Sequence, residues 1–155
     1  MDLPQLNLPN FEFRFKTKND KIYIFDSFRK KDILLTPEEW VRQNVLEYLV
    51  QFKNYPKSLI AVEKEINING LKRRYDALVF DKNQDISLLI EFKASNIKIN
   101  EQVFNQISAY NYLLEAPYLL VSNGLNHYFA KVDIKAKKYS FLEEIPDFGI
   151  ITNEK

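Results

Sequence analysis

Two acidic residues and one lysine in neighbouring expected strands have the types and spacing of a metal-assisted hydrolytic site. Asp76 lies in the expected strand 72–80, and Glu91-Phe92-Lys93 closes an apolar run that begins at Ile86. Side chains two apart along a strand share a face, so we expect Glu91 and Lys93 to point the same way. Asp76 precedes Glu91 by fifteen residues across one polar turn. Antiparallel pairing would therefore bring two carboxylates and a lysine to one spot.

Those residue types suit a hard divalent cation. Mg²⁺ binds oxygen ligands, keeps several waters and typically uses one or two carboxylates. The backbone carbonyl of Phe92 is a further candidate oxygen ligand. A lysine beside such a cation can orient an attacking water and stabilise the charge that develops on a phosphoryl group. Structural alternatives stay open, since Asp76 could pair with Arg73 or Arg74, and Glu91 with Lys93.

A second polar pair belongs to an expected helix over residues 100–115. Gln106 and Tyr110 are four residues apart and therefore lie on one helical face. That face could look across the end of the sheet towards Lys93. The commoner fates of these residue types are a surface glutamine and a core tyrosine.

The hydrophobic pattern predicts the elements that position these residues. The alternation of Phe11, Phe13 and Phe15 predicts a hairpin over residues 11–25. Thr36-Pro37-Glu38-Glu39 is a strong helix start, and apolar spacing carries that helix to about Lys53. Turns at Asn69-Gly70 and at residues 81–85 divide three strands over residues 59–68, 72–80 and 86–94. Further strands are expected at residues 118–121, 127–134 and 139–142.

This order of elements predicts one α/β (α+β) domain over residues 1–155, with a mixed central sheet flanked by helices. We expect an N-terminal extension over residues 1–35, a core over residues 36–130 and a β tail over residues 131–155.

The composition excludes several classes of protein and site. The absence of cysteine rules out disulfide scaffolds, thiol nucleophiles and Cys-zinc sites, and the single histidine rules out a multi-His metal site within the chain. No glycine pattern fits a P-loop or a dinucleotide fingerprint. A net charge of +1 excludes a polycationic nucleic-acid coat but leaves room for a local basic groove. Without a secretory signal or cysteines, we expect a cytoplasmic protein.

The ordered set of motifs resembles a known family. Asp76, Glu91-x-Lys93 and Gln106-x-x-x-Tyr110, in the order strand, strand, helix, are similar to the PD-(D/E)xK nuclease superfamily in its RecB-like branch. More narrowly, the motifs between residues 36 and 124 resemble the N-terminal nuclease domain of type I restriction enzyme R subunits: Thr36–Gln43, Arg74-Tyr75-Asp76, Leu89–Lys93, Asn105-Gln106, Tyr110-Asn111 and Ala116–Gly124. One departure is Tyr75, where the superfamily signature has proline.

The resemblance implies a restriction-endonuclease-like core and a Mg²⁺- or Mn²⁺-dependent DNA nuclease. It implies metal ligation by Asp76 and Glu91, with Lys93 as the catalytic lysine. Gln106 and Tyr110 would support Lys93 or contact DNA phosphate. The family also uses a glutamate of the first helix near the metal, for which Glu39 is the candidate, although a capping box with Thr36 explains a glutamate there equally well.

The resemblance to restriction subunits also implies binding partners and leaves two alternative functions open. The motor that follows this domain in restriction subunits is absent from these residues, so we expect DNA as one partner and a separately encoded helicase, translocase or other restriction subunit as another. An oligomer is compatible with the sequence, whereas a membrane partner is not expected. A catalytically weak nucleic-acid-binding or adaptor module on the same fold, and a purely structural network of residues 76, 91 and 93, both remain open.

Overall fold

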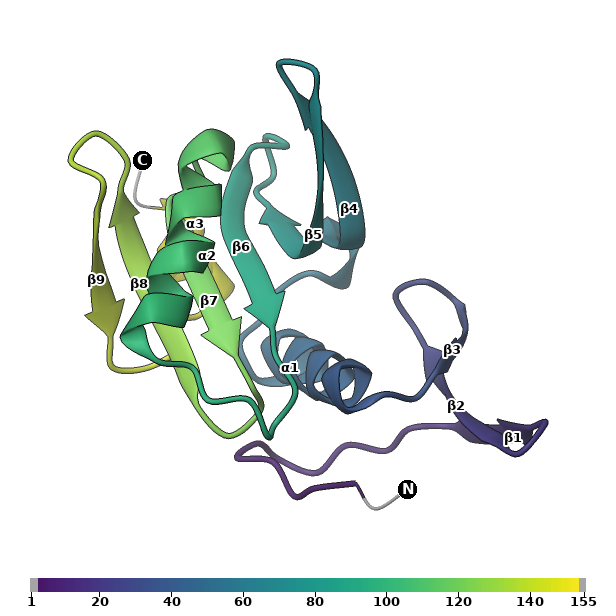
Figure 1. The fold of residues 1–155 in the computed structure, drawn as a ribbon. Coiled ribbons are helices and arrows are strands. Elements are labelled where there is room, and N and C mark those ends of the chain that lie inside the picture. The colour runs from purple at the N-terminus through teal and green to yellow at the C-terminus, as the bar shows by residue number, and fades with distance from the viewer. Residues whose placement is uncertain (1–2, 154–155) are drawn as a thin grey trace.

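The protein is described here by a computed structural model that covers residues 3–153 (Figure 1). A six-stranded sheet forms its centre, in the order β4-β5-β6-β7-β8-β9. Only β6 and β7 run parallel, and the other neighbours are antiparallel. Its strands are β4 (Ile60–Ile68), β5 (Leu71–Phe80), β6 (Ile86–Phe92), β7 (Tyr118–Ser122), β8 (His127–Asp133) and β9 (Lys138–Leu142). The predicted meander of three antiparallel strands and the predicted mixed sheet are confirmed.

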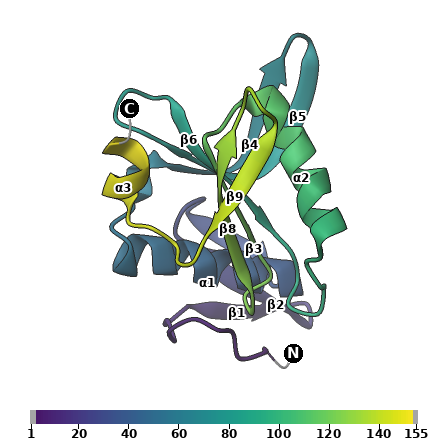
Figure 2. The same cartoon turned by 90° about the vertical axis from the view of Figure 1, so that its left-hand side faces the viewer.

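Two capped helices cover opposite faces of the sheet. In α1 (Pro37–Phe52), the Thr36 hydroxyl accepts a hydrogen bond from the backbone N–H of Glu39 at 3.1 Å, which confirms Thr36 as the N-cap, while the Glu39 carboxylate bonds to other side chains. In α2 (Glu101–Leu114), the Asn100 side chain accepts from the backbone N–H of Val103 at 2.8 Å. The buried face of α1 packs on one set of sheet residues and that of α2 on another, so the two cores are separated by the strands (Figure 2).

The N-terminal region differs from its prediction. The expected hairpin over residues 11–25 starts only at β1 (Phe15–Lys18) and returns as β2 (Lys21–Asp26). Phe11 and Phe13 precede the hairpin, because their rings instead contact Phe52 and Trp40 at centroid distances of 6.0 and 5.5 Å. A third strand that was not predicted, β3 (Lys31–Leu34), pairs with β2 and completes a separate antiparallel sheet.

Two short helices were also not predicted. A 3-10 turn (Lys57–Leu59) precedes β4, and α3 (Phe148–Asn153) ends the described chain. Phe148 packs edge-to-face on the ring of Tyr55 at a centroid distance of 5.6 Å, which ties α3 to the end of α1.

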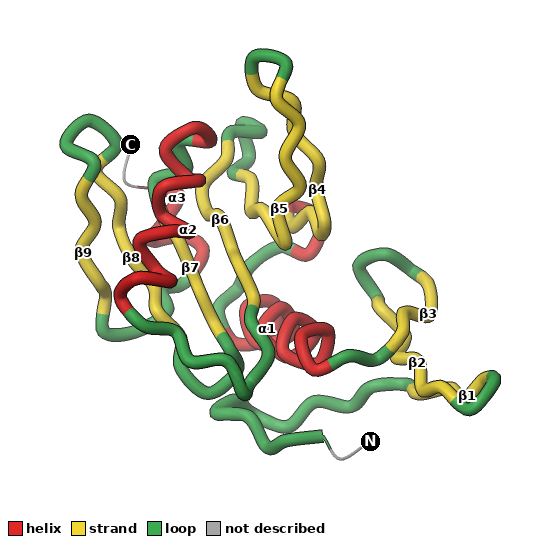
Figure 3. The backbone as a smooth tube through the Cα atoms, in the orientation of Figure 1, coloured by secondary structure: helices red, strands yellow, loops and turns green. Residues whose placement is uncertain are grey.

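The central sheet divides at the position of Asp76. β5 pairs with β6 only from Ala77 onward, whereas β4 and β5 continue to pair beyond a gap at Glu63 and Asp76, as far as Ile68 and Leu71. Beyond the fork, β6 continues beside β7 alone, with Glu91 opposite Val121. The outer part of the β4–β5 hairpin consequently rises away from the sheet (Figure 3). This α+β architecture fits a restriction-endonuclease-like fold.

Candidate active site

Asp76 lies at the fork and fastens β5 to β6. Its Oδ2 accepts a hydrogen bond from the backbone N–H of Phe92 at 2.8 Å. That bond replaces the ladder contacts that the diverging strands no longer make. It also holds the Asp76 carboxylate against the peptide next to Glu91, while a quarter of the side chain, 25%, stays exposed to solvent.

Glu91 and Asp76 meet at this point. The two side chains are hydrogen-bonded to each other. Burial, together with the charge of Asp76 and that hydrogen bond, raises the pKa of Glu91 from 4.5 to about 9, and the charge of Lys93 counteracts this rise. Near neutral pH, Glu91 therefore keeps its proton, because ionising a buried carboxyl next to a second carboxylate costs free energy.

Lys93 lies one residue beyond β6, since the expected strand 86–94 ends at Phe92. Its backbone N–H donates to the carbonyl of Ser122 at 2.9 Å, and this bond fixes the start of the following loop against β7. Lys93 is half-buried, and its positive charge opposes the rise in the pKa of Glu91 and of Glu38. Within residues 3–153 it forms no ion pair shorter than 4.0 Å, so its charge remains available to a ligand.

The glutamate of α1 that faces this site is Glu38. Partial burial and the charge of Asp76 raise the pKa of Glu38, while Arg42 and Lys93 lower it. Glu39, which the resemblance suggested as a metal ligand, points elsewhere. Its carboxylate is buried and accepts from Arg29 at 2.8 Å, from Gln43 at 2.9 Å and from Arg42. Because these donors occupy both oxygens of Glu39, we transfer the proposed metal role to Glu38.

Arg42 joins the first helix to the fork, and the sequence analysis missed it. Its guanidinium group lies 3.5 Å from Glu38, 3.9 Å from Asp76 and 3.5 Å from Glu63. Glu63 lies within β4 opposite Asp76, at the position where the pairing with β5 is interrupted, and has a φ of 51°, which is unusual for a residue other than glycine. The ion pairs of Glu63 with Arg29 and Arg42 stabilise this strained conformation. The i,i+4 spacing of Glu38 and Arg42 was the available sequence signal.

The helix α2 contributes less than the sequence suggested. Gln106 is exposed and makes no hydrogen bond to Lys93 among residues 3–153. Tyr110, four residues on, is also exposed, and its ring lies under the guanidinium group of Arg73 at 4.7 Å. The structure thus brings Tyr110 to β5 rather than to Lys93.

The donor set at the fork consists of carboxylates beside a lysine. Asp76 and Glu91 are in contact, the charge of Asp76 helps to raise the pKa of Glu91, and Lys93 and Glu38 border the pair. Mg²⁺ commonly binds through one or two carboxylates and retains several waters. No group of three or more His, Cys, Asp or Glu side chains placed to hold a metal ion occurs in residues 3–153.

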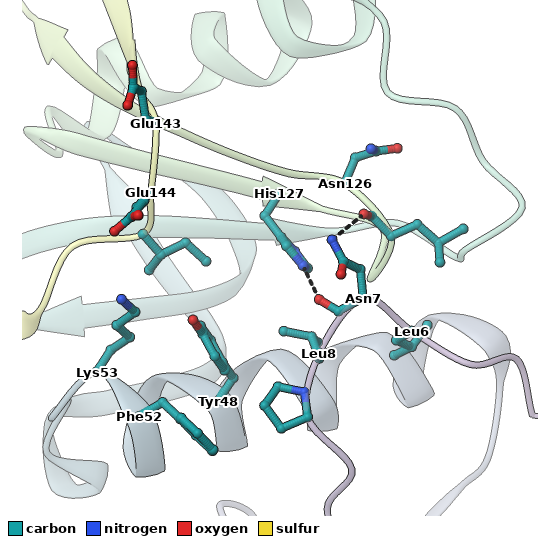
Figure 4. Close-up of a pocket in the computed structure, with 13 residues that line it drawn as sticks. Leu6, Asn7, Leu8, Tyr48, Phe52, Lys53, Asn126, His127, Glu143 and Glu144 are labelled. Carbon is teal, nitrogen blue, oxygen red and sulfur yellow. Dashed lines mark hydrogen bonds between the residues drawn. The ribbon is translucent and has the colours of Figure 1, made fainter.

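The single histidine belongs to a different region. A hollow of about 850 Å³ lies between the N-terminal segment, α1 and the segment after β9 (Figure 4). At its edge His127 Nε2 lies 3.1 Å from the carbonyl of Asn7, and Nδ1 lies 2.7 Å from the hydroxyl of Ser122. Burial lowers the pKa of His127, which favours the neutral ring. His127 therefore fastens the N-terminal segment to β8.

Comparison with known protein families matches the part of the chain that contains the site. The family model described as Type I restriction enzyme R protein N terminus (HSDR_N) covers residues 37–146, from the start of α1 to beyond β9. A comparison with curated proteins gave no match. In residues 3–153 we find no helix with the length and apolarity of a membrane span. Since the family match covers well over half of the sequence, the chain belongs to the family of type I restriction enzyme R protein N-terminal domains.

Proposed function

We propose that this protein is a divalent-metal-dependent DNA nuclease that hydrolyses phosphodiester bonds. The observation that carries the proposal is the contact between Asp76 and Glu91 beside Lys93, with the pKa of Glu91 raised to about 9. A divalent cation relieves the repulsion between two close, buried carboxylates, so binding one stabilises this pair more than it would a solvated pair. Membership of a restriction-enzyme family makes DNA the substrate class to test first.

The proposed division of roles follows the geometry. Asp76, Glu91 and the backbone carbonyl of Phe92 would hold the cation, and Glu38 would hold one of its waters from α1. The cation, when bound, supplies Lewis-acid polarisation of the phosphodiester. Lys93 orients the attacking water and stabilises the charge that develops on the phosphoryl oxygens. Gln106 is at most a supporting residue, since it is exposed and makes no hydrogen bond to Lys93 among the described residues.

The direct test is cleavage of supercoiled plasmid DNA with Mg²⁺ or Mn²⁺. The net charge of only +1 predicts weak, salt-sensitive binding, so the assay belongs at low salt and high protein concentration. We expect nicking that EDTA abolishes and that Asp76→Asn or Glu91→Gln reduces by about a hundredfold or more. Glu143→Gln, an exposed substitution near the end of β9, is the matched control and should cut normally.

A catalytically weak DNA-binding module is the competing outcome of the same assay. If the protein binds both the cation and DNA yet cuts no DNA under any tested condition, the nuclease proposal fails and the binding module replaces it. Because the family name refers to one part of an R protein, the assay is repeated with a helicase, translocase or other restriction subunit added.

A further inference from the structure

Among the described residues, Arg73 has no acidic partner. It lies on β5 three residues before Asp76, and its guanidinium carbon stands 4.7 Å above the ring of Tyr110. Its Nε is buried and makes no hydrogen bond, and within residues 3–153 Arg73 forms no ion pair with any carboxylate. Arginine presents a planar fork of N–H donors, and burying part of that fork without a partner costs free energy.

The ring of Tyr110 explains how Arg73 is held. Tyr75 is buried in the core cluster on the α2 side, and Arg73, two residues earlier, follows the same strand face towards α2. Stacking on an aromatic face fixes the plane of a guanidinium group while leaving its edge free to donate hydrogen bonds. Tyr110 is itself 44% exposed, so the stacked pair lies at the surface rather than in the core.

The surrounding hairpin arm, defined as residues 64–75, concentrates positive charge. It contains Lys64, Lys72, Arg73 and Arg74 but only one acidic residue, Glu65, which lies opposite Arg74. Lys64, Lys72 and Arg74 are exposed. The arm rises from the fork at Asp76 (Figure 1), and the contact between Arg73 and Tyr110 joins it to α2. A chain with a net charge of +1 therefore gathers four of its cations on the arm that leads to Asp76.

We propose that Arg73, oriented by the ring of Tyr110, binds a backbone phosphate of DNA next to the Asp76–Glu91 site, and that the hairpin arm follows the adjoining backbone. This inference rests on the proposed nuclease function for the choice of DNA as the ligand. The guanidinium fork matches two phosphate oxygens, and its orientation on Tyr110 lowers the ordering cost of binding. Tyr110 is then a positioning residue that acts through Arg73.

The test measures DNA affinity without cleavage. Fluorescence anisotropy of a labelled duplex in Ca²⁺ or EDTA, at several salt concentrations, gives both the Kd and its salt dependence. We expect Arg73→Gln to weaken binding on the order of tenfold, because one charge-assisted phosphate contact is lost. The slope of log affinity against log salt should fall by about one. A merely structural role for Arg73 would leave this slope unchanged.

Further variants separate charge from orientation. Arg73→Lys keeps the charge, so the slope should be retained while affinity falls. Tyr110→Phe keeps the ring and should bind as the unmodified protein does, whereas Tyr110→Leu should weaken binding several-fold. The matched control is Arg14→Gln, because Arg14 also lies over an aromatic ring, that of Phe25 at 4.2 Å, in the N-terminal sheet. Arg14→Gln should leave affinity and slope unchanged.

The outcomes distinguish this inference from the nuclease proposal. Equal affinity and equal slope for Arg73→Gln and the unmodified protein would overturn the phosphate site, even if plasmid cleavage were normal. An unmodified protein that does not bind the duplex would overturn it as well. A lower affinity and a smaller salt slope in Arg73→Gln support the phosphate site, whether or not the protein cleaves DNA with Mn²⁺. An absence of cleavage contradicts only the nuclease proposal.

Discussion

At the scale of single residues, the contact between Asp76 and Glu91 dominates the chemistry. A carboxyl whose pKa is raised from 4.5 to about 9 binds its proton more tightly in the folded than in the unfolded chain. The proton thus stabilises the metal-free fold fully below the unfolded pKa, and this stabilisation is lost as the pH rises towards the folded pKa. A divalent cation competes with that proton, so its affinity should increase over the same range.

The first prediction concerns this pH dependence. In EDTA, the free energy of unfolding should fall as the pH rises from 4.5 towards about 9, and Glu91→Gln, which cannot titrate, should show a smaller fall. Urea denaturation at several pH values in that window measures both. Glu143→Gln serves as the reference for an exposed glutamate. An equal loss of stability with pH in Glu91→Gln and the unmodified protein would contradict this prediction.

The second prediction concerns Lys93. Lys93→Ala leaves both acidic ligands in place, so Mn²⁺ should still bind while DNA cleavage falls by about a hundredfold or more. Calorimetry and the plasmid assay report the two properties separately. Lys138→Ala, an exposed lysine of β9, is the control. A Lys93→Ala variant that loses Mn²⁺ binding along with cleavage would show that the lysine maintains the site rather than acts in the reaction.

At the scale of elements, two adjacent glutamates in the first turn of α1 have different surroundings. Glu39 is buried among Arg29, Arg42 and Gln43, whereas the side chain of Glu38 is 48% exposed and faces Asp76. The sequence predicted the cap and the helix, because Thr36-Pro37 is a local signal. It did not predict which glutamate faces the site, since this depends on how the helix is rotated against β4 and β5.

The third prediction separates those two glutamates. Glu39→Gln leaves the buried Arg42 and the half-buried Arg29 short of a counter-charge and should lower the free energy of unfolding by about 3–5 kcal/mol. Glu38→Gln should change stability little but reduce cleavage and Mn²⁺ affinity. Chemical denaturation and the plasmid assay are made on both variants. Equal loss of stability in the two would contradict the assignment of separate roles.

The strands show the same division between local and long-range signals. The turns at Asn69-Gly70 and at residues 81–85 predicted the meander, and Asn69, Gly70 and Gln84 do adopt positive φ angles there. β3 escaped prediction because its first residues, Lys31-Asp32, are charged and have the pattern of a connector, although its partner β2 directly precedes it in the chain. The fork at Asp76 and the strained Glu63 opposite it arise from tertiary packing, which the alternation of apolar and polar residues along a strand does not predict.

At the scale of the whole molecule, two sheets and α1 meet at the site through ion pairs. Arg29 belongs to the turn between β2 and β3 and binds Asp26, Glu39 and Glu63, while Arg42 continues the network to Asp76. The N-terminal sheet, which lies outside the matched family region, is therefore joined to the residues that shape the fork. Resemblance supplied the identity of the candidate residues, and the fold supplies the physical reason why they meet.

The central claim is that Asp76 and Glu91 together bind a divalent cation, and a Mn²⁺ titration followed by electron paramagnetic resonance tests it most directly. We predict that the unmodified protein binds Mn²⁺, that Asp76→Asn and Glu91→Gln each weaken this binding by about tenfold or more, and that Glu143→Gln does not. Absence of Mn²⁺ binding by the unmodified protein, or equal binding by it and both site variants, would contradict the account.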